Sequence, residues 1–170
     1  MSAPAEVEVG RAIGMPVERK EDKKLLQGQA QWVDNMHVPG MVYLGIVRSP
    51  YAHARIVKVD AMPALAHAEV VGAWSGEDIA DEWHGSLPCA WLPTEDTNAP
   101  EHKPVATDKV RYAGDAVAVI AALSRGAAED AMELVEVEYE PLPVVVDPEA
   151  ALADGAPLVH DEFGTNRCYT

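Results

Sequence analysis

Apolar residues fall into short runs that are separated by glycine, proline and charged positions. The segment MVYLGIV (residues 41–47) is almost continuously apolar, which is typical of a strand covered on both faces. ARIVKVD (54–60) and EVVGAW (69–74) predict two further strands. DKVRYAGDAVAVIAA (108–122) predicts a short strand, a glycine turn at Gly114 and then the most buried strand of the chain.

The segments that follow show two other periodicities. SRGAAEDAMELV (124–135) predicts a helix with one alanine face and one acidic face: Ala127, Ala128 and Ala131 against Glu129, Asp130 and Glu133. VEVEYE (135–140) alternates as a strand does, with Val135, Val137 and Tyr139 inward and Glu136, Glu138 and Glu140 outward. We interpret those glutamates as a solvent face rather than a catalytic carboxylate cluster, because no base or nucleophile accompanies them.

Weaker sequence signals predict the remaining elements. Ser75 and Asp78 form an S-x-x-D pattern that predicts a capped short helix over GEDIA (76–80). PLPVVVDPEAAL (141–152) ends in another short helix, and residues 17–34 end in a short amphipathic piece. Residues 81–107 contain four prolines and little periodicity, so they predict a long loop. Local antiparallel pairs with one strand–helix–strand crossover favour an α+β fold with a mixed, largely antiparallel sheet.

Charge excludes one class of partner. The formal net charge is −15, distributed as +2 over residues 1–59, −7 over 60–125 and −10 over 126–170. Such a chain is repelled by phosphate backbones, so nucleic acid is not an expected partner. The acidic part is either a solvated surface or a face that docks a basic partner.

Membrane, secretion and redox signals point to the cytoplasm. The longest apolar run, AVAVIAAL (116–123), is too short to span a bilayer, and the N-terminus does not resemble a secretory signal. Cys89 and Cys168 form no CxxC pair, which suggests a reducing compartment.

Motifs for catalysis or phosphate binding are missing. The chain contains no G-x-G-x-x-G, G-x4-G-K-[ST], G-x-S-x-G or HExxH sequence. His84, Cys89 and His102 lie on the long loop, but their spacing matches no structural zinc pattern. We therefore expect polar loop residues there and no metal site.

The segment VRSPYAHARI (47–56) concentrates polar chemistry between two predicted strands. Arg48, His53 and Arg55 could bind an anion, or they could bond carbonyls and carboxylates where two strands cross. Pro50 removes a ladder donor, so the chain should turn there or lie at an edge. Without a glycine-rich loop or a nucleophile nearby, we favour a structural corner.

PGMVYLGIVRSPYAHARIVKVD (39–60) resembles the N-terminal segment of the large subunit of molybdenum hydroxylases, the family of xanthine dehydrogenase, aldehyde oxidase and aerobic carbon monoxide dehydrogenase. Three further segments resemble the same family: residues 9–35, VRYAGDAVAVIAA (110–122) and 127–152. The first carries the family's R-x-E-D-x-x-L-x-x-G-x-x-x-(aromatic/apolar)-x-D entry, here on Arg19, Glu21, Asp22, Leu25, Gly28 and Asp34. Tyr51 departs from the pattern, since a histidine is common there.

This resemblance implies the family's α/β-hammerhead domain. It implies an N-terminal arm at residues 1–16, the hammerhead at 17–150, and at 151–170 an exit segment towards a molybdopterin-binding region that the chain does not contain. No catalytic, cofactor or metal residue is transferred. The implied structural corner and interface comprises Arg48, Pro50, His53, Arg55 and Gly114. Trp83, Cys89 and Trp91 on the long loop are candidates for bordering a substrate entrance.

The implied parent enzyme oxidises a small molecule with water as the oxygen source. Molybdopterin would be bound by the remainder of the large subunit, and 2Fe-2S clusters and FAD by an iron–sulfur subunit and a FAD subunit. The chain itself is expected to be inactive and to serve structure and assembly. Two alternatives remain, namely a free-standing acidic interaction module and a small hydrolase that uses a loop histidine.

Overall fold

The computed structural model describes residue 14 and residues 16–88, 92 and 94–170. The chain divides into two compact units, residues 1–40 and 41–170. In the described part of the first unit, a five-residue helix α1 (Asp22–Leu26) and a 3-10 helix (Val33–Asn35) have no buried residue. The amphipathic piece expected over residues 17–34 therefore buries no apolar side within its own unit. The predicted boundaries after residues 16 and 150 stay predictions.

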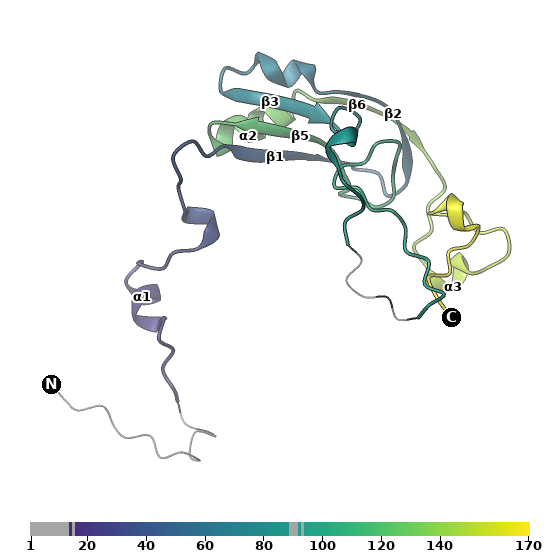
Figure 1. Cartoon of the computed structure of the whole chain (residues 1–170), viewed down its shortest axis with the longest axis horizontal. Helices are drawn as coiled ribbons and strands as arrows, with labels where there is room; N and C mark the ends of the chain where they lie inside the picture. Colours follow the sequence, from purple (N-terminus) through teal and green to yellow (C-terminus); the bar gives the residue numbers. More distant parts are fainter. Residues whose placement is uncertain (1–13, 15, 89–91, 93) are drawn as a thin grey trace. The chain divides into compact units, whose positions relative to one another are not determined.

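The described part of the second unit forms two three-stranded antiparallel sheets (Figure 1). The first sheet has the order β1 (Tyr43–Arg48), β5 (Ala116–Ala122) and β3 (Val70–Ser75). The second sheet has the order β4 (Lys109–Val110), β2 (Ala54–Asp60) and β6 (Glu136–Pro141). Every pairing among these strands is antiparallel, which confirms the expected α+β class.

Strand β5, which its apolar sequence predicted to be the most buried strand, forms the centre of the first sheet. It pairs with β1 on one side and with β3 on the other, and five of its seven residues are buried. For β1 the expectation of two covered faces is wrong. It is an edge strand whose Leu44 side chain is 65% exposed. Within this unit, therefore, only one face of β1 is covered, although its sequence is apolar on both.

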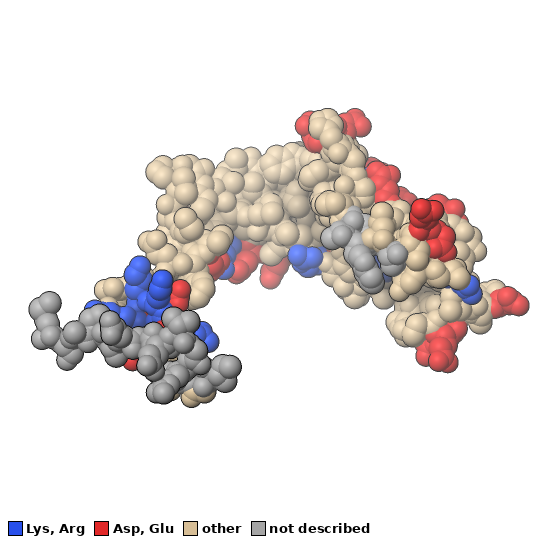
Figure 2. All heavy atoms as spheres, turned by 60° about the horizontal axis from the view of Figure 1, so that its bottom comes forward, with Lys and Arg blue, Asp and Glu red and all other residues tan. Residues whose placement is uncertain are grey.

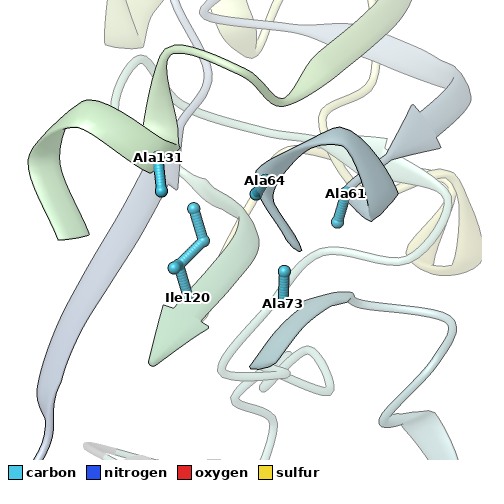
Figure 3. Packing of buried hydrophobic residues seen from close by; sticks show 5 residues of the cluster. All are labelled: Ala61, Ala64, Ala73, Ile120 and Ala131. Carbon is cyan, nitrogen blue, oxygen red and sulfur yellow. The ribbon is translucent and has the colours of Figure 1, made fainter. Parts of the chain in front are cut away.

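Helix α2 (Arg125–Met132) covers the inner face of the first sheet, and small residues allow a close approach. Ala61, Ala64, Ala73 and Ala131 surround Ile120 in this core (Figure 3). A Cβ atom on Gly45 would lie 3.1 Å from the Ala128 carbonyl oxygen, so β1 passes directly under the helix. The Ser124 hydroxyl caps α2 by accepting from the Ala127 amide. The predicted alanine and acidic faces are confirmed.

The α2 segment leads from β5 to β6, which belong to different sheets. The predicted strand–helix–strand crossover thus connects the two sheets and adds no parallel strand to either. Along β6 the glutamates are exposed while Val137 and Tyr139 are partly buried, as the alternation predicted. The short helix α3 (Pro148–Ala151) also forms, and the Asp147 carboxylate accepts from the Ala150 amide at its start.

The α-helix predicted over residues 76–80 is wrong. The Ser75–Asp78 bonds do form, with the Ser75 amide 2.8 Å from Asp78 Oδ2, but turns follow and then a 3-10 helix (Ala80–Glu82). The Ser75–Asp78 bonds satisfy the same backbone and side-chain groups in a turn as in a helix cap, so the S-x-x-D pattern does not require an α-helix to follow. From there to β4, the described residues form neither helix nor strand, which agrees with the expected long loop.

Candidate functional site

Residues 49–53 carry the chain from β1 in the first sheet to β2 in the second, so the predicted corner joins two sheets. The Ser49 amide donates to the Asp115 carbonyl at 2.8 Å, and the Gly114 amide donates to the Ser49 carbonyl at 2.8 Å. Gly114 has φ 95°, a left-handed conformation that favours glycine. The β4–β5 turn is thereby attached to the corner.

Polar side chains of the corner bond to its own backbone. Arg48 Nη1 donates to the Gly114 carbonyl at 2.8 Å. The Ser49 hydroxyl accepts from the Tyr51 amide at 3.0 Å and donates to the Tyr51 carbonyl at 3.1 Å. Asp115 Oδ2 accepts from the Arg111 amide at 3.1 Å. In these contacts the donors and acceptors hold the turn.

His53 connects the corner to the segment that follows β6. It is 6% exposed, and its Nδ1 lies 2.8 Å from the Pro143 carbonyl oxygen, so Nδ1 carries the proton and donates. The Leu142 amide donates back to the His53 carbonyl at 3.0 Å. Tyr51 and Tyr139 pack beside this contact with ring centroids 5.1 Å apart. His53 Nε2 is buried and has no hydrogen-bond partner among the described residues.

The other two predicted corner residues lie on the surface. Arg55 Nε is 3.3 Å from Glu140 Oε2 in a cross-strand ion pair whose side chains are both more than half exposed. Such a pair contributes about 0–1 kcal/mol. Pro50 is exposed directly after β1. Sequence reasoning missed the buried Ser49 and Asp115, although the Ser-Pro break and the polar residue after Gly114 marked both positions.

A cavity of about 470 Å³ lies next to the corner, lined by charged side chains that include Lys109, Arg111, Asp115 and Glu162. Lys109 is buried and forms an ion pair with Asp161, and that hydrogen bond holds the pKa of Asp161 below its usual value. Arg111 Nη1 donates to the Lys109 carbonyl at 3.3 Å. The buried Lys109 is thus neutralised by Asp161, whereas the Nε atom of Arg111 has no hydrogen-bond partner among the described residues. The Lys109–Asp161 contact attaches residues 159–163 to β4.

The described residues offer no ligand set for a metal or a metal cofactor. Among them, no group of three or more His, Cys, Asp or Glu side chains lies close enough to hold an ion. His84 and His102 are both exposed, and Cys89 lies outside the described residues. In the described residues, no helix has the length and apolar character that crossing a membrane requires.

The long loop carries one described tryptophan. Trp83 is 37% exposed, whereas Trp91, like Cys89, lies outside the described residues. Two parts of the loop bond to each other, because the Leu87 amide donates to the His102 carbonyl at 2.7 Å and the His102 amide donates to the Ser86 hydroxyl at 2.7 Å.

Comparison with known proteins assigns the family. Residues 27–143 match the family described as aldehyde oxidase and xanthine dehydrogenase, a/b hammerhead domain. The chain is 35% identical to the carbon monoxide dehydrogenase large chain of Hydrogenophaga pseudoflava over 96% of its own length and 20% of that protein. It is 36% identical to the xanthine dehydrogenase molybdenum-binding subunit of Escherichia coli O157:H7, over 79% and 18% of the two chains.

A solved structure gives the same result. Quinoline 2-oxidoreductase from Pseudomonas putida 86 is similar with a TM-score of 0.77 and 36% identity, covering 88% of this chain and 19% of that one. The chain spans about a fifth of the length of the curated relatives it matches. With the two-sheet fold and the corner at residues 47–56, the chain belongs to the aldehyde oxidase and xanthine dehydrogenase a/b hammerhead domain family.

Proposed function

We propose that this chain is the structural and assembly domain of the large subunit of a molybdenum hydroxylase-type oxidoreductase. The observation that carries the proposal is its match to about one fifth of relatives that include a molybdenum-binding subunit. The parent enzyme oxidises a small molecule with oxygen from water. Molybdopterin is bound by the remainder of the large subunit, and 2Fe-2S clusters and FAD by partner subunits or domains.

The chemistry of the corner supports a scaffold role. Arg48, Ser49 and the Nδ1 atom of His53 bond to backbone groups, and the buried Lys109 is paired with Asp161. An oxidoreductase centre requires a cofactor, and the described residues provide no metal ligand set. The free Cys168 fits a reducing compartment, so we place the enzyme in the cytoplasm.

Reconstitution of activity tests this function. The purified chain is mixed with the separately expressed remainder of the large subunit and the iron–sulfur subunit, and reduction of an artificial dye is followed with candidate substrates. We expect no turnover by the chain alone and restored turnover by the mixture. Turnover by the 170-residue chain alone would instead favour an independent enzyme.

The alternative is an acidic interaction module without an enzyme. Its support is the acidity of residues 126–170, whose formal charge is −10. Figure 2 shows acidic side chains at several separate places on one face of the molecule. This alternative predicts that the chain folds but binds neither the remainder of the large subunit nor the iron–sulfur subunit. Binding of a basic partner without any gain in dye reduction would support it.

We further propose that the long loop borders the substrate entrance. Trp83 is partly exposed on a proline-rich segment, and Trp91 and Cys89 belong to the same segment of the sequence. A partly exposed tryptophan such as Trp83 contributes little to the stability of a monomer, so it suggests a contact surface. Replacing Trp83 and Trp91 by alanine in the full enzyme should raise KM for bulky substrates about tenfold, the effect of losing roughly 1.4 kcal/mol of binding. Unchanged KM values across several substrates would contradict this role.

A further inference from the structure

The first sheet has an outer face that turns away from α2. Strand register places two rows of residues on it: Leu44, Ala121 and Gly72 in one row, and Ile46, Val119 and Trp74 in the other. The intervening rows, which contain Ile120 and Ala122, pack against α2 and the 3-10 helix Met62–Ala66. Alternation along each strand therefore assigns the first two rows to the opposite face.

This outer face is apolar and exposed. Leu44 is 65% exposed, Trp74 39%, and Val71, at the register shift in β3, 60%. The Trp74 ring lies over Gly72, where an added Cβ would be 2.2 Å from a ring carbon. Ile46, Val119 and Ala121 are only partly buried. The outer face, defined here as Leu44, Ile46, Val71, Trp74, Val119 and Ala121, contains no charged residue.

Such a face has a recognisable kind of partner. Antiparallel sheets that face water carry polar residues on the wet side, as β6 does with its glutamates. Interfaces that form and dissociate are about as polar as ordinary surface, whereas permanent ones resemble a core cut in half. An uncharged, aromatic and aliphatic sheet face therefore fits a permanent apolar neighbour better than a transient one.

The length of the relatives indicates which neighbour it is. About four-fifths of the carbon monoxide dehydrogenase large chain and of the xanthine dehydrogenase molybdenum-binding subunit lies outside the region that this chain matches. We propose that the outer face of the first sheet is the surface on which the remainder of the same large subunit packs permanently. This inference rests on the proposed assembly function and adds the surface that performs it.

One substitution in two contexts tests the inference. Leu44→Glu places a charge on the outer face, and Val57→Glu places one on a strand residue of the second sheet with similar exposure, 59% against 65%. Both variants are made in the 170-residue chain and in the full enzyme, and thermal unfolding is recorded. We expect Leu44→Glu to leave the Tm of the chain almost unchanged but to lower that of the full enzyme by about 5 °C or more. Val57→Glu should change neither.

Hydroxyl-radical oxidation of Trp74 provides a second measurement. Its rate should fall at least about fivefold from the chain to the full enzyme, because buried side chains are shielded from solvent. Equal oxidation of Trp74 in the chain and in the full enzyme, together with no effect of Leu44→Glu on the Tm of the enzyme, would overturn the inference. Restored dye reduction would in that case still support the proposed function. A chain that dimerises alone and is made monomeric by Leu44→Glu would assign the face to a second copy and overturn it too. A wild-type chain that restores no dye reduction would contradict the proposed function itself.

Discussion

Replacing His53 by alanine is expected to lower the free energy of unfolding of the chain by about 2–4 kcal/mol. The imidazole is 6% exposed, and its Nδ1 donates to the Pro143 carbonyl at 2.8 Å. Removing it leaves a cavity between the corner and the segment after β6, and it removes the donor to that carbonyl. Urea unfolding, followed by circular dichroism, measures the change.

A matched variant separates the hydrogen bond from the packing. In His53→Asn the side-chain amide can still donate to the Pro143 carbonyl, while His53 Nε2, which has no partner, is removed. This variant should retain more than half of the stability that alanine loses. Equal destabilisation by both substitutions would show that the hydrogen bond is unimportant, and no destabilisation by either would contradict the structural role of the corner.

Replacing Gly76 by alanine is expected to destabilise the chain by about 2–3 kcal/mol. Gly76 is buried where the turn after β3 meets residues 105–106, and an added Cβ would lie 2.2 Å from the Ala106 carbonyl oxygen. The obstructing atom belongs to the backbone, so no side-chain rotation relieves the clash. The Ala106 amide donates to the Ala116 carbonyl at 2.8 Å, so a shift of this loop would also disturb the start of β5.

Gly126→Ala is the control for this second substitution. Gly126 lies in the first turn of α2, and an added Cβ meets no atom within 4 Å. Alanine in a helix is favoured over glycine by about 0.5–1 kcal/mol, so this variant should be neutral or slightly more stable. Thermal and urea unfolding are measured for both variants. An equal change of stability in Gly76→Ala and Gly126→Ala would contradict the close packing at Gly76.

Patterns that depend on a strand or helix period predicted most of the second unit. The alternation of glutamate with Val137 and Tyr139 gave β6, and the alanine spacing gave the buried face of α2. The continuous apolar run AVAVIAA predicted a strand that is buried on both faces, and five of the seven residues of β5 are buried. The structural interpretation of residues 47–56 relied on the absence of reactive groups, and the backbone bonds of Arg48 and Ser49 agree with it.

The sequence could not reveal which strands share a sheet. Strands β1 and β2 follow each other along the chain, yet a tight polar corner sends them into different sheets. The bonds that hold this corner come from Gly114, Asp115 and Pro143, which are distant in sequence. The apolar run of β1 was equally ambiguous, because it does not distinguish a strand buried within its unit from one whose outer face is open there. The helix expected after Ser75 failed since its capping bonds form equally well in a turn.

The most direct measurement of the assembly role is the molybdenum content of the large subunit with and without residues 41–170. The full enzyme and a variant lacking this unit are each purified with the iron–sulfur subunit, and the 170-residue chain is then supplied separately to the variant. We expect the variant to lose bound molybdenum and its partner subunit, and the supplied chain to migrate with the complex and restore both. A variant that keeps its molybdenum and its partner without residues 41–170 would contradict the account.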